Sequence, residues 1–224
     1  MTYKKQRTKI KFVFESAMLQ KNFYIRNAHS SIQKLNRLFP IVPPFIVAHI
    51  FQNRTSFLEA IHKKKIPDWL VAYVPPKSTS SIYILNNKEK LTTKKIVSQI
   101  LLHEMTHLYT NALNPNLPDW LKEGISVYVA EQIFRSSIST TDWKKIAQKD
   151  IPFGRISWEF AAEHNGYNIA GLLIMFFVRR YGWAKFITAI SYRQSMHFSI
   201  KNFSLYFDEK FEWFIADFKK QFIK

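Results

Sequence analysis

The sequence predicts an α+β fold, with a sheet-containing N-terminal lobe and a helical C-terminal lobe in a single domain over residues 1–224. Two observations predict it. Up to residue 85, short apolar runs and alternating runs, typical of strands, are interspersed with helical patterns, and beyond residue 92 helical spacing prevails. The composition, with 47% apolar residues and 5 glycines, fits a globular core. We expect residues 1–112 to form the sheet lobe with the first long helix, and residues 113–224 the helical lobe.

The N-terminal lobe is expected to contain four strands and two helices. In chain order, the predicted elements are a strand over 9–15, a helix over 27–38, a strand over 45–51, a helix over 55–63 and strands over 69–74 and 81–85. Thr55 is the candidate N-cap of the second helix. The segment 81–86 (SIYILN) is interpreted as an edge strand, which favours pairing with an extended peptide.

The helical lobe begins with a long helix that Thr92 or Thr93 is expected to cap. Its predicted helices run from there to 112 and over 119–134, 142–148, 167–181, 183–192 and 208–222. Asn114-Pro115 ends the first of these, Pro118 precedes the second and Gly182 ends the apolar helix over 167–181. Apart from the short helix over 142–148, residues 135–165 are interpreted as a loop that forms one wall of a substrate pocket.

The segment Leu101-Leu102-His103-Glu104-Met105-Thr106-His107 carries the chemistry. On a helix, residues four apart lie on one face, so His103 and His107 can reach one metal ion. Glu104 points about a quarter-turn away, where a carboxylate can act as a base toward a zinc-activated water. The pattern His-Glu-x-x-His thus supplies two metal ligands and a base on one helix. The apolar residues on either side of it predict that this helix is buried. The alternative interpretation is a pair of histidines hydrogen-bonded on a solvated face.

A catalytic zinc site needs a third protein ligand and an open position. Glu123, in Trp120-Leu121-Lys122-Glu123-Gly124, is the candidate, because the loop after His107 can turn the chain back. The absence of a side chain at Gly124 is expected to let the second helix approach the first closely. The alternative for Glu123 is a solvent-facing charge.

His-Glu-x-x-His followed by Trp-Leu-x-Glu-Gly-x-x-x-Tyr resembles the gluzincin zinc metallopeptidases, and most closely the compact bacterial peptidase MA-like proteins. The resemblance implies a zincin-like fold, Zn²⁺ held by His103, His107 and Glu123, and Glu104 as catalytic base. It is specific over residues 96–131 and looser over 160–224. There, Tyr167 matches a transition-state tyrosine of the aminopeptidases, with Tyr128 and His164 as weaker alternatives. Val127 departs from the thermolysin branch, which has an acidic residue at this position.

The resemblance implies zinc-dependent hydrolysis of peptide bonds in a peptide or protein substrate. The sequence contains no motif of the Gly-x-Met-Glu-Asn type, which holds a free substrate amino terminus in the aminopeptidases, so endopeptidase action is favoured. The alternative is a zinc-binding regulatory or interaction protein that has no catalytic activity on the same fold.

Charge and composition limit the other classes of function. The chain has no cysteine, so a metal site must use His, Asp and Glu. The formal net charge of +17 raises affinity for polyanions, but the lysines lie along the whole chain, so a nucleic-acid partner is not favoured. The longest apolar run, 169–178, is shorter than the roughly 20 residues that a membrane span needs. We expect a cytoplasmic protein without a membrane span.

Overall fold

The computed structural model describes residues 8–15, 21–86, 93–148, 151–153, 156–191 and 202–224. The chain forms two compact units, Met1–Asn116 and Leu117–Lys224. Helices and strands occur together, which confirms the prediction of a mixed α and β fold.

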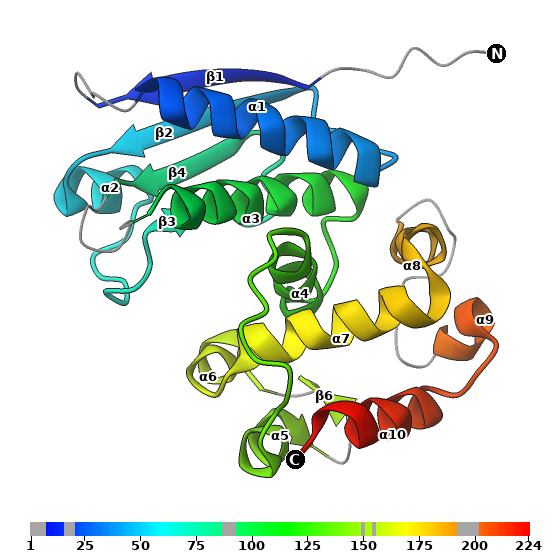
Figure 1. The fold of residues 1–224 in the computed structure, drawn as a ribbon. Helices are drawn as coiled ribbons and strands as arrows, with labels where there is room; N and C mark the ends of the chain where they lie inside the picture. The colour runs from blue at the N-terminus through cyan, green and yellow to red at the C-terminus, as the bar shows by residue number, and fades with distance from the viewer. Residues whose placement is uncertain (1–7, 16–20, 87–92, 149–150, 154–155, 192–201) are drawn as a thin grey trace, which may run out of the picture. The chain divides into compact units, whose positions relative to one another are not determined.

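The first unit is built on a four-stranded sheet with the order β1-β2-β4-β3 (Figure 1). The parallel strands are β1 (Lys9–Phe14), β2 (Phe45–Phe51) and β4 (Ser81–Leu85). A short strand, β3 (Ala72–Tyr73), pairs antiparallel with β4. The prediction that the segment 81–86 forms an edge strand is therefore wrong, because Tyr83 and Ile84 have partners on both sides. The sequence predicted a strand over 69–74 but not its pairing with β4, because pairing is a tertiary contact.

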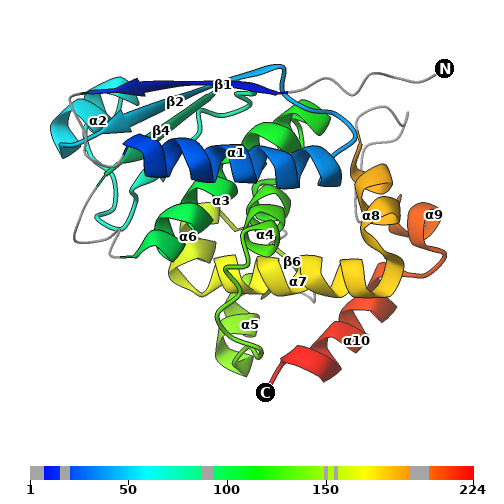
Figure 2. The ribbon, with the colours of Figure 1, turned by 45° about the horizontal axis from the view of Figure 1, so that its top comes forward.

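Helices cover both faces of this sheet. Helices α1 (Lys21–Leu38) and α3 (Lys94–Leu113) lie side by side against one face (Figures 1 and 2). Helix α2 (Arg54–Ala60) lies over the other face, where Phe57 is buried against Leu85. Because side chains alternate along a strand, both faces of β2 are packed, as its apolar sequence predicts.

Two helix starts in this unit differ from the prediction. Helix α1 begins at Lys21, before the expected start at residue 27. Helix α2 is capped by Asn53, whose side chain accepts a hydrogen bond from the Ser56 backbone N–H at 2.8 Å, so the expected cap at Thr55 is wrong. Asn is at least as good an N-cap as Thr, so the sequence does not show which of the two residues caps the helix.

Helix α3 is fixed at both ends and along its length. The Thr93 side chain caps it by accepting from the Ile96 N–H at 3.2 Å, as one of the two alternatives predicted. The Tyr109 hydroxyl donates to Asn36 Oδ1 on α1 at 2.6 Å. The Asn111 amide donates to the Ser78 carbonyl at 2.8 Å. These bonds set the rotation of α3 about its axis, and therefore which of its side chains face the sheet.

Where the structure describes it, the second unit consists of helices and a two-stranded hairpin. Its elements are α4 (Asp119–Val129), α5 (Thr140–Ile146), β5 (Ala147–Gln148), β6 (Ile151–Pro152), α6 (Trp158–Glu163), α7 (Gly166–Tyr181), α8 (Trp183–Ile190), α9 (Phe203–Phe207) and α10 (Phe211–Phe222). The expected extension of α4 to residue 134 is wrong, because Glu131 takes a positive φ of 57° after the Ala130 C-cap. The sequence patterns also missed the hairpin, α6 and α9, which are short. Tyr192, the expected end of α8, lies outside the described residues.

Helix α7 forms the centre of the second unit. It packs against α4, where Gly124 approaches the Ala170 backbone so closely that a Cβ added to Gly124 would meet the Ala170 carbonyl oxygen at 2.7 Å. Further along the helix, the ring of Phe177 packs against that of Phe214 of α10, with centroids 4.2 Å apart and planes tilted by 33°. The described part of the chain contains no helix that is both long enough and apolar enough to cross a membrane.

Candidate metal centre

The imidazoles of His103 and His107 lie one turn apart on α3 and converge. Their Nε2 atoms are 3.1 Å apart, and the ring planes stand at 71° to each other. His103 is buried, with 9% of its surface exposed, and His107 is half-buried. This confirms the expectation that His103 and His107 lie on the same face of one helix.

The spacing of the two nitrogens suits a shared cation. Two ligands about 2.05 Å from a tetrahedral zinc lie about 3.3 Å from each other, close to the observed separation. A direct hydrogen bond between the rings, with one Nε2 donating, gives a similar distance. The His pair alone therefore does not distinguish a metal site from a hydrogen-bonded pair.

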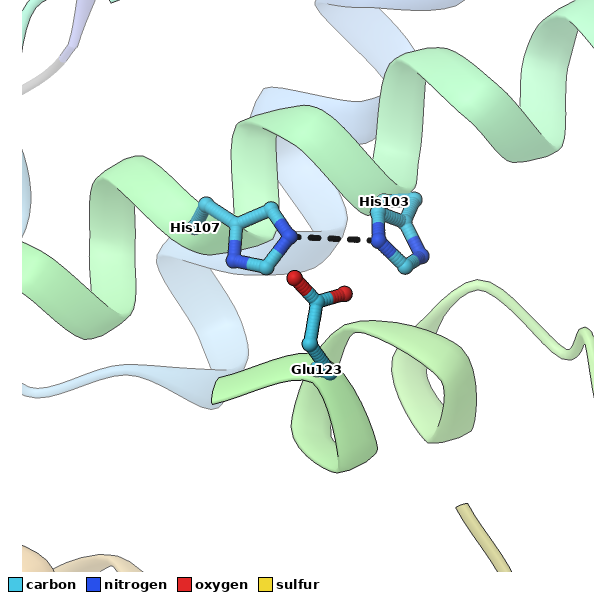
Figure 3. Close-up of side chains that lie close together, drawn as sticks. All are labelled: His103, His107 and Glu123. Atoms are coloured by element: carbon cyan, nitrogen blue, oxygen red, sulfur yellow. Dashed lines mark hydrogen bonds between the residues drawn. The ribbon is translucent and has the colours of Figure 1, made fainter. Parts of the chain in front are cut away.

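Glu123 adds the third donor group. One ligand atom each from His103, His107 and Glu123 lie within 4.8 Å of one another, and the Glu123 carboxylate points toward the two rings (Figure 3). Two imidazoles and one carboxylate are the donor set of known catalytic zinc sites and leave a coordination position open. The three residues can therefore bind a metal ion.

Glu104 follows His103 on α3 and is half-buried. Because successive helical residues are about 100° apart, its side chain projects from a different face than the two rings. A carboxylate at this position is suited to proton transfer beside a metal site rather than to ligation.

Gly124 has a role other than the one expected. The sequence suggested that its missing side chain lets α4 approach the preceding helix, whereas in the structure a Cβ at Gly124 would meet Ala170 and Ile174 of α7. Val127, which replaces the acidic residue of the thermolysin branch, is buried, and its side chain fills the space where a Cβ on Gly171 would lie. Gly124 and Val127 thus allow α4 to pack closely against α7, and this packing fixes the helix that carries Glu123.

Tyr167 lies in the first turn of α7, and its hydroxyl accepts a 3.4 Å hydrogen bond from Trp158 Nε1. It precedes Ala170 by one helical turn, so it lies near the part of α7 that receives α4. Tyr128 stacks on Trp183, and His164 packs edge-on against Phe160.

An aromatic cavity in the second unit was missed by sequence reasoning. It has a volume of about 120 Å³ and is lined by Trp120, Phe153 and Trp158 among others. Trp120 is one turn before Glu123 on α4, and its ring stacks on Phe153 with centroids 5.6 Å apart. Phe153 and Trp158 belong to the region interpreted as a loop, and no sequence pattern near them indicates that they pack against α4.

Comparison with models of known protein families finds no match for this sequence, and comparisons with curated proteins and with solved structures find no match either.

Proposed function

We propose that this protein is a zinc-dependent peptidase of the gluzincin type with a zincin-like fold. The grouping of His103, His107 and Glu123 is the single observation that carries the proposal. The sequence pattern His-Glu-x-x-His supports it, because that pattern also supplies a base, Glu104, beside the two ligands.

Each residue has one task in the proposed reaction. His103, His107 and Glu123 hold the ion, and zinc, when bound, supplies a Lewis acid that lowers the pKa of water. Glu104 takes a proton from the attacking water and passes it to the leaving amine. Tyr167 donates a hydrogen bond to the developing oxyanion. The match of Tyr167 to the aminopeptidase tyrosine supports this assignment, and Tyr128, whose ring stacks on Trp183, is the alternative.

Endopeptidase action is the proposed mode. The edge-strand argument for it no longer applies, because β4 is an inner strand of the sheet. The remaining support is that the sequence lacks the aminopeptidase motif for a substrate amino terminus.

The test combines metal analysis with cleavage of casein, an unstructured protein substrate. We expect about one zinc per chain in the wild type and chelator-sensitive cleavage. Glu123→Ala should lose both after dialysis, because it removes a ligand. Glu104→Gln should keep the zinc but lose cleavage by about 10²- to 10⁴-fold, because it removes only the base. Glu212→Ala, an exposed position in the same unit as Glu123, is the matched control and should retain both.

The outcomes separate the alternatives. Zinc in the wild type and in Glu104→Gln without casein cleavage favours the non-catalytic zinc-binding protein. Absence of zinc from the wild type after reconstitution overturns the proposed site, and zinc retention in Glu123→Ala overturns Glu123 as a ligand.

A further inference from the structure

A second, larger cavity lies within the helical unit and uses none of the proposed zinc-site residues. Its volume is about 620 Å³, within the range of roughly 300–1,000 Å³ that holds small organic ligands. Three segments line it: the stretch after α4, one side of α7 and the end of the chain after α10. The lining residues lie far apart in sequence, so the cavity is a product of tertiary packing.

The cavity has an apolar floor and a cationic rim. Leu172 and Phe222 are buried at the floor, and Met175 is half-buried beside them. The rim carries two exposed arginines, Arg135 and Arg179, and the exposed residue Lys224. Among the described residues that line the cavity there is no aspartate or glutamate.

Two carboxylates of the α9–α10 region are engaged by a different cation. Arg180, next to Arg179, binds Glu209 at 2.7 Å and Asp217 at 2.8 Å. These two ion pairs hold acidic side chains of the α9–α10 region at Arg180. The positive charge at Arg179 adds to that of Arg135 at the rim.

Hydrogen bonds hold the rim in place. Asn168, which is fully buried on α7, accepts from the backbone N–H groups of Phe134 and Arg135 at 3.2 Å and donates to the Arg135 carbonyl at 3.2 Å. On the opposite side, the Lys224 N–H donates to the Ile138 carbonyl at 3.0 Å, and Thr140 donates to the Lys224 carbonyl. A buried amide that makes three bonds to one short segment pre-organises it.

We propose that this cavity binds an amphipathic organic anion, with a carboxylate head on Arg135 and Arg179 and an aliphatic body on the floor. Guanidinium groups bind carboxylates through paired, charge-assisted hydrogen bonds, which a neutral head group does not form. The floor contributes by removing the aliphatic body from water. The chemical class is that of medium-chain fatty acids.

The test uses octanoate as the probe and octan-1-ol as its uncharged counterpart of equal chain length, with affinities measured by ligand-detected NMR on the full chain. We expect octanoate to bind the wild type more tightly than octanol does. Arg179→Glu should weaken octanoate binding by about tenfold or more while leaving octanol binding unchanged, because a 1.4 kcal/mol loss corresponds to tenfold. Lys64→Glu, an exposed cation in the other unit, makes the same change in net charge and should leave both affinities unchanged.

A second variant tests the floor without relying on charge. Met175→Trp should weaken octanoate and octanol together, because the larger side chain occupies part of the floor where the aliphatic body would lie. Circular dichroism checks that each variant is folded, and Ser136→Asp, at an exposed lining position, replaces Arg179→Glu if that variant is not. If Lys64→Glu weakens octanoate binding as much as Arg179→Glu does, the affinity depends on net charge and the proposed site is overturned. Binding to phosphatidylglycerol vesicles without binding of octanoate overturns it in favour of a lipid surface. Zinc content and casein cleavage are independent of all these results.

Discussion

His49 shows how one residue adapts to the packed face of the sheet. Its ring stacks on that of Tyr83, its partner across the β2–β4 ladder, with centroids 4.8 Å apart and planes 8° apart. Burial disfavours the charged imidazolium, and this lowers the pKa of His49 below its usual value. The neutral form of this ring is therefore favoured more strongly in the folded protein than in the unfolded chain.

This depressed pKa predicts a pH-dependent stability. Above the ordinary histidine pKa, near pH 6.5, both states are neutral and the stabilisation is fully present. As the pH falls below that value, the unfolded chain takes up a proton first, and stability is lost as the pH falls through the folded pKa. His49→Phe keeps the stacking and should make the free energy of unfolding less dependent on pH in this range. Urea midpoints of the chelator-treated protein from about pH 8 to about pH 5 measure it.

His29→Phe, at an exposed position on α1, controls for the loss of an imidazole and should follow the wild type. Parallel curves for the wild type and His49→Phe throughout this pH range would show that the environment of His49 is not the cause.

Some residues of the site could be predicted and others could not. The positions of His103 and His107 follow from a four-residue spacing, which is a local property of a helix. Glu123 followed from its motif context, and the structure groups it with the two histidines. The partner of Gly124 was assigned to the wrong helix, because the sequence shows that a close approach is permitted but not which element makes it.

At the scale of elements, the periodic segments were predicted well. The strands at β1, β2 and β4 and the helices α3 and α7 were expected within one residue or so of their bounds, since each carries several periods of apolar residues. The errors lie in helix ends and short elements, such as the end of α4 and the two-residue β3. These depend on a single cap or a single tertiary contact, which sequence periodicity does not encode.

The contact between α4 and α7 gives the prediction at this scale. Gly124→Ala should destabilise the protein by about 1–3 kcal/mol, because its Cβ would meet the Ala170 carbonyl oxygen at 2.7 Å and the backbone must move. The higher helix propensity of alanine offsets this cost only in part. Urea denaturation followed by circular dichroism measures the change.

Ala216→Ser, on the exposed side of α10, is the control and should change stability by less than about 0.5 kcal/mol. An unchanged or raised midpoint for Gly124→Ala would mean that α4 and α7 lie further apart than the structure has them.

For the whole molecule, the net charge of +17 predicts binding to polyanions without sequence preference. Two DNA duplexes of unrelated sequence should bind with equal affinity, and that affinity should fall by about tenfold or more when salt rises from about 0.05 M to about 0.2 M. Fluorescence anisotropy measures both. A clear preference for one duplex that persists at the higher salt would contradict the expectation and favour a nucleic-acid-binding role.

The parallel order of β1, β2 and β4 has a consequence for the speed of folding. Lys9 pairs with Phe45 and Val47 with Ser81, residues 36 and 34 positions apart, so each ladder forms only after a long stretch of chain has closed. The helical unit gains much of its structure from contacts within single helices, which form early. Since non-local pairing slows folding, the sheet unit should reach its native state later and expose unpaired strands meanwhile. Recovery from denaturant should therefore depend on protein concentration, through aggregation of chains whose sheet is incomplete.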